Sequence, residues 1–153
     1  MCSAVIRIRR LKMRRYLLLL LMPVLWGCER QDSVSAAIAQ QYQSANGAVD
    51  LTRIIDDPWD RVCIFGPYSS INNTAEEMNI DWKTLESSNT ESDEGVNRLV
   101  FLSGRDVVAY VVHPRSQGDF SNLSKQCFFR ESAKFIDQKS PPEGWPGLFP
   151  LEN

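Results

Sequence analysis

The chain has 153 residues, of which 43% are hydrophobic and 24% charged, and its formal net charge is −2 at pH 7. This length suits one domain with a targeting segment rather than several domains. Residues 1–27 carry six basic side chains and no acidic ones, so residues 28–153 hold eleven basic and nineteen acidic side chains, a formal charge of −8. Such a domain repels phosphate backbones, and nucleic acid is therefore not an expected partner.

The N-terminal segment has the composition of a bacterial signal peptide. Six basic residues lie within positions 7–15, and an uncharged, mostly apolar run follows from Tyr16 to Trp26. That run is too short to cross about 30 Å of hydrocarbon comfortably as a permanent helix, but it has the length of a signal-peptide core. Residues 1–27 are therefore predicted to be a signal peptide, with Met13 as an alternative translation start.

The end of this segment, Leu25-Trp26-Gly27-Cys28, resembles the lipobox of bacterial lipoproteins. The resemblance covers residues 13–28 and implies that Cys28 is lipidated and becomes the first residue of the mature protein. It also implies a periplasm-facing position in the cell envelope, with the membrane bound through that lipid. Glu29 is not the Asp that favours retention in the inner membrane, so the outer membrane is the preferred destination. The alternatives are an ordinary cleaved signal peptide and an uncleaved anchor.

The first part of the mature chain alternates between polar and strand-like segments. Residues 28–37 are polar and small and are expected to form the lipidated N-terminus and a tether. The elements expected next are a short helix over 36–45, a strand over 49–55 ended by Asp56-Asp57-Pro58, and a buried strand over 62–65 ended by Gly66-Pro67.

The second part contains the clearest hairpin. A short capped helix is expected over 73–78 and a polar acidic loop over 86–95. The following elements are strands 97–102 and 107–113 around a Gly-containing turn, a strand over 125–129 that extends towards Ile136, and a Pro/Gly-rich tail over 140–153 that cannot be a helix or a central strand. These elements predict one α+β domain over 38–153, with a small antiparallel sheet and one or two short helices.

Four cysteines are present, and two of them remain for the mature fold. Cys2 leaves with the leader and Cys28 carries the lipid, which leaves Cys63 and Cys127. An even pair in an oxidising compartment predicts a disulfide between neighbouring strands or packed sheets, with two buried thiols as the alternative. Without a C-x-x-C motif and with a single His, neither a redox-active pair nor a metal site is expected, and no cofactor is predicted.

Two groups of side chains are candidates for chemistry. Asp56, Asp57 and Asp60 are suited to Ca²⁺, but their spacing departs from a calcium loop and turn formation is the favoured role. His113 is a conceivable general base with Cys63 as nucleophile. A strand-end His before a Pro is expected at the surface, and Cys63 is expected in the disulfide. No catalytic residue is therefore predicted, and the chain is not expected to be an enzyme.

The functional hypotheses concern binding. The aromatic residues Trp59, Tyr68, Trp145 and Phe149 either pack in the domain or line a partner surface, with packing favoured for Trp59. The favoured function is a non-enzymatic binding or assembly lipoprotein with an envelope protein partner. The alternative is a periplasmic inhibitor or immunity-type lipoprotein whose acidic loop 86–95 enters a basic toxin or hydrolase. A hydrolase is disfavoured because no acid, base and nucleophile constellation is recognisable.

Overall fold

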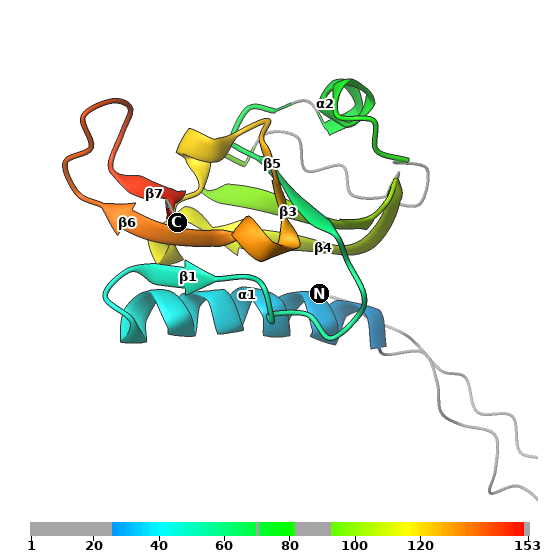
Figure 1. Ribbon diagram of the computed structural model, residues 1–153, viewed down its shortest axis with the longest axis horizontal. Helices are drawn as coiled ribbons and strands as arrows, with labels where there is room; N and C mark the ends of the chain where they lie inside the picture. Colours follow the sequence, from blue (N-terminus) through cyan, green and yellow to red (C-terminus); the bar gives the residue numbers. More distant parts are fainter. Residues whose placement is uncertain (1–25, 70, 82–92, 152–153) are drawn as a thin grey trace, which may run out of the picture.

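The computed structural model describes residues 26–69, 71–81 and 93–151 (Figure 1). The predicted signal peptide up to Leu25 and most of the acidic loop 86–95 lie outside these residues. The helices and strands are α1 (Trp26–Ser44), β1 (Ala48–Asp50), β2 (Arg61–Phe65), α2 (Ile71–Glu77), β3 (Val96–Ser103), β4 (Asp106–Pro114), β5 (Cys127–Phe129), β6 (Lys134–Gln138) and β7 (Gly147–Pro150). Three 3₁₀ turns, η2 (Arg115–Gln117), η3 (Ser121–Leu123) and η4 (Arg130–Ser132), join the later strands.

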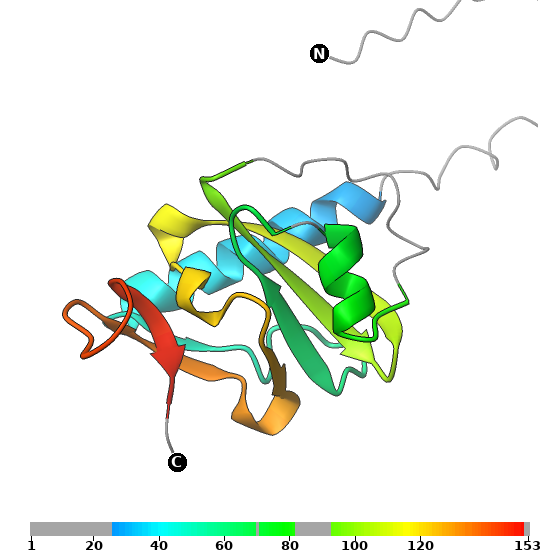
Figure 2. The same ribbon diagram turned by 90° about the horizontal axis from the view of Figure 1, so that it is seen from above.

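The strands form two antiparallel sheets, which confirms the α+β class. One sheet has the order β4-β3-β2-β5 and the other the order β1-β6-β7. Helix α1 runs beneath the sheets and α2 lies on the opposite side of the four-stranded sheet (Figures 1 and 2). Because that sheet is covered on both faces, its two central strands are almost entirely buried.

Two apolar clusters hold these layers together. Side chains alternate between the faces of a strand, so β2 and β3 contribute to both clusters. The larger cluster contains Ile38 of α1, Leu99 and Phe101 of β3, and Phe135 of β6. The smaller one lies under α2 and contains Cys63, Phe65, Val100, Leu102, Ala75 and Ile80.

The predicted hairpin and the buried strand β2 are confirmed, and two expected strands are corrected. Strand β1 ends at Asp50 rather than 55, because Asp50 Oδ1 accepts a hydrogen bond from the Thr52 N–H and starts a turn. The strand expected to run from 125 towards Ile136 is divided by η4, so that β5 joins one sheet and β6 the other. The tail contributes β7, an edge strand of the three-stranded sheet that ends at Pro150.

Helix α1 is the largest departure from expectation. A tether was predicted over 28–37 and a helix over 36–45, but α1 begins at Trp26 and ends at Ser44. Val34, Ser35 and Ile38 are buried against the rest of the domain. Burial of this face stabilises a helix whose polar composition alone does not predict it.

Candidate functional site

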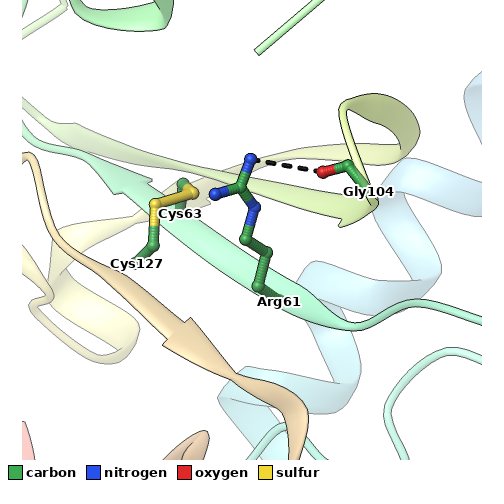
Figure 3. Close-up of a disulfide and its surroundings, with 4 residues drawn as sticks. All are labelled: Arg61, Cys63, Gly104 and Cys127. Carbon is green, nitrogen blue, oxygen red and sulfur yellow. Dashed lines mark hydrogen bonds between the residues drawn. A yellow bond between two sulfur atoms is a disulfide. The ribbon is translucent and has the colours of Figure 1, made fainter. Parts of the chain in front are cut away.

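Cys63 and Cys127 form a disulfide between neighbouring strands, as predicted. They lie directly opposite each other in the β2–β5 register, with their Cα atoms 4.0 Å apart. Figure 3 shows the bond beside Arg61, whose Nη2 donates a 3.2 Å hydrogen bond to the carbonyl oxygen of Gly104. The disulfide therefore links β2 and β5 of one sheet. Through Arg61, β2 is also hydrogen-bonded to the β3–β4 turn.

The disulfide removes the candidate nucleophile. Cys63 belongs to the cluster under α2, whereas His113 is opposite Asn97 and shares the β4 face of Val111, which packs towards α1. The two side chains therefore lie on opposite faces of the sheet. The structure does not bring them together, and they cannot form a catalytic pair.

His113 is fully buried, so the expectation that it lies at the surface is wrong. Its Nε2 is 3.2 Å from the carbonyl oxygen of Gln117, which can only accept, so Nε2 carries the proton and donates. Nδ1 is then an acceptor and receives a 3.0 Å hydrogen bond from the Ser35 hydroxyl. Phe120 packs against the imidazole edge to face. The contact fastens α1 to β4, and sequence patterns carry no signal for it because the partners are 78 residues apart.

This buried His gives the fold a pH dependence. Burial lowers the pKa of His113 and outweighs the hydrogen bond to Gln117, which raises it. The His of the unfolded chain has a pKa near 6.5, so as the pH falls it binds a proton before the buried His113 of the folded chain does. This contribution to stability is fully present above about pH 6.5 and is lost as the pH falls below that value.

We expect the melting temperature to fall between pH 7.5 and pH 5.5, and the decrease to be smaller in His113→Gln. Thermal unfolding followed by circular dichroism measures both. His113 is the only His in the chain, so no second imidazole competes for the assignment. Identical pH slopes for the two proteins would contradict the expectation.

Of the three Asp residues near Pro58, Asp60 stabilises the local structure through hydrogen bonds. The Asp60 carboxylate accepts a short hydrogen bond from the Gly104 N–H, and the Asp60 carbonyl accepts one from the Arg130 N–H. Asp56 and Asp57 lie in the bends between β1 and β2. Across residues 26–69, 71–81 and 93–151, no group of three or more His, Cys, Asp or Glu side chains is placed to hold a metal ion.

The feature best suited to contact another molecule is Trp145, in the loop between β6 and β7. Its side chain is 79% exposed, whereas Trp59 is buried against Phe101 and beneath the Arg130 guanidinium. The backbone of Trp145 is nevertheless held. Asn122 Nδ2 donates to its carbonyl oxygen at 2.7 Å, and its N–H donates to Asn122 Oδ1 at 3.2 Å. A large aromatic side chain is thus presented to solvent from a fixed backbone.

Two glycines allow this close approach to Asn122. Gly144 and Gly147 have φ values of +83° and +155°. A Cβ on Gly144 would be 2.9 Å from Asn122 Oδ1, and one on Gly147 would be 2.8 Å from the Asp119 carbonyl oxygen. Glycine is therefore required at positions 144 and 147 of the tail, because a side chain there would displace the Trp145 loop from the domain.

Asp119 holds the segment that carries Asn122. Its carboxylate accepts hydrogen bonds from Arg115, Asn97 and Ser121. Partial burial would raise the pKa of Asp119, but these hydrogen bonds outweigh it and lower the pKa. Its carbonyl oxygen accepts from the Leu148 N–H at 2.8 Å, which ties this segment to β7. The Asp-x-Ser turn is a sequence signal that would have identified Asp119; nothing local indicated Asn122.

The described part of the chain contains no helix that is both long and apolar enough to cross a membrane. Comparisons with family models, with curated proteins and with solved structures found no match for the chain.

Proposed function

We propose that the chain is a cell-envelope lipoprotein, anchored by lipid on Cys28, whose domain is a non-enzymatic binding or assembly module that engages a protein partner through the Trp145 loop. The anchoring part of the proposal comes from the lipobox-like sequence before Cys28. The disulfide supports it, because such bonds persist in oxidising compartments such as the periplasm. The observation that carries the binding part is the exposure of Trp145 on a fixed backbone.

The anchor and the Trp145 loop lie at opposite ends of the domain. Helix α1 starts at one end, and the loop between β6 and β7 projects at the other (Figures 1 and 2). Cys28 is only six residues before Val34, about 9 Å along a helix, so the lipid would hold the domain close to the membrane surface. The Trp145 loop would then face away from the lipid, towards proteins of the periplasm.

A non-enzymatic role agrees with the burial of the Ser35–His113 pair. His113 has no exposed surface, and Ser35 is covered as well, so a substrate has no access to this hydroxyl and imidazole. The Ser35–His113 hydrogen bond instead holds α1 against β4. Tryptophan is, in addition, among the residues that most often contribute strongly to protein interfaces.

The alternative is a periplasmic inhibitor or immunity-type lipoprotein that blocks a basic toxin or hydrolase. The formal charge of −8 on residues 28–153 favours this function, because it would steer a cationic partner to the domain. Salt distinguishes the two. Capture of a basic secreted protein that is lost at high ionic strength would favour the inhibitor, and salt-resistant capture through Trp145 would favour the assembly module.

The binding proposal predicts a specific loss on Trp145→Ala. Tagged full-length protein, purified in mild detergent, is used to capture partners from envelope extract. We expect Trp145→Ala to recover at least about tenfold less of the partner than the unaltered protein, as for a central aromatic contact. Phe129→Ala is the matched control, since Phe129 is a large aromatic side chain, 65% exposed, on β5 of the four-stranded sheet. Equal capture by Trp145→Ala and the unaltered protein would overturn the assignment of this loop.

A further inference from the structure

Arg98 is a charged side chain buried in the interior of the four-stranded sheet. It lies on β3 between Phe65 of β2 and Val112 of β4, and only 1% of it is exposed. Because alternate residues of a strand share a face, Arg98 lies on the side of Val100 and Leu102, which α2 covers. The fold therefore places a guanidinium among apolar side chains.

This guanidinium has no counterpart among the described residues. None of its three nitrogen atoms, Nε, Nη1 and Nη2, has a hydrogen-bond partner there. The ion pairs of that part of the chain are formed by Arg115, Lys125, Lys134 and Lys139. A guanidinium keeps its positive charge in any folded protein, and burying it without an anion is strongly unfavourable. The position calls for an oxyanion.

The surroundings select a monoanion. The other basic side chain of this face, Arg61, lies four residues along β2 from Phe65, about 13 Å away, and is used at the β3–β4 turn. One positive charge beside Phe65 and Val112 matches one negative charge, whereas a phosphate dianion would need more than one charged donor. A carboxylate is planar and accepts two parallel N–H hydrogen bonds from a guanidinium. A small apolar group attached to it would pack against Phe65 and Val112.

We propose that Arg98 binds the carboxylate of a small apolar monocarboxylic acid on the face of the four-stranded sheet that carries Val100 and Leu102. The acid would enter through the cover of this face, to which α2 contributes Ala75. That helix has only seven residues, and a short helix opens at low cost. The site is separate from the Trp145 loop, which follows β6 in the other sheet.

Isobutyrate and inorganic phosphate, at matched ionic strength and pH 7, are suitable probes for the full-length protein in non-ionic detergent. We expect isobutyrate to shift the Arg98 Nε–H resonance in a saturable way, and saturation to raise the melting temperature by about 4 °C. Arg98→Met, which identifies the resonance by its absence, should fold and should show no rise. Arg105→Met is the matched control at an exposed position in the β3–β4 turn, and it should keep the rise.

Three results would overturn the proposal. The first is a saturable shift with phosphate and none with isobutyrate, which would indicate a dianion site. The second is no response to either probe together with a higher melting temperature of Arg98→Met, which would show a guanidinium that binds no acid. The third is an isobutyrate effect that persists in Arg98→Met, which would place the binding elsewhere.

Discussion

Replacing Cys63 and Cys127 together by alanine is expected to lower the free energy of unfolding by about 4 kcal/mol. The bond spans a sequence separation of 64 residues, and closing a loop of that length removes much conformational entropy from the unfolded chain. Domains of this kind unfold with only about 5–15 kcal/mol, so the loss is a large part of the total. Chemical denaturation of the purified full-length protein measures it.

We expect most of this loss in the free energy of unfolding because the β2–β5 register places Cys63 and Cys127 directly opposite each other. Reduction of the unaltered protein should cause a similar loss and should shift its mobility in a denaturing gel. The double variant should respond to reductant in neither experiment. Two freely alkylated thiols in native protein taken from the envelope would contradict the expectation.

Cys28→Ala is expected to abolish lipid labelling completely and to leave an uncut precursor. Only a thiol at this position accepts the lipid in the lipoprotein pathway that the Leu25–Cys28 segment resembles, and the dedicated peptidase acts on the lipidated form. Metabolic labelling with palmitate and the apparent mass of the product measure the two effects.

Cys2→Ala is the matched control for this experiment, because it removes the other cysteine of the N-terminal segment. It should be labelled and shortened normally. Continued labelling of Cys28→Ala would refute lipidation at Cys28. A Cys28→Ala product that is shortened as usual would indicate an ordinary signal peptidase site instead.

Features that depend on neighbouring residues could be predicted from the sequence. Apolar, β-branched runs on both sides of Gly104 were enough to predict the β3–β4 hairpin. The run before Gly66-Pro67 was enough for β2, since a central strand covered on both faces is continuously apolar. The disulfide followed from counting cysteines and from the compartment, without knowledge of the register.

Features that depend on distant residues could not be predicted from the sequence. The polar segment 28–37 has little tendency to form a helix alone, and α1 exists because Val34 and Ile38 are buried by strands that come later in the chain. The run after Gln126 looked like one strand, but η4 sends β5 and β6 into different sheets. His113 looked exposed before Pro114, yet Ser35 and Phe120 cover it.

The sequence by itself was enough to predict a basic N-terminal segment with a lipobox-like end, an acidic α+β domain after it, and a disulfide between Cys63 and Cys127. Local composition and spacing are sufficient for these conclusions. The tertiary structure alone decided that Trp145 is exposed while Trp59 is buried, and that Arg98 is buried with no hydrogen-bond partner among the described residues. Exposure and pairing depend on which distant strands meet, and residues far apart in the chain meet only after it has folded.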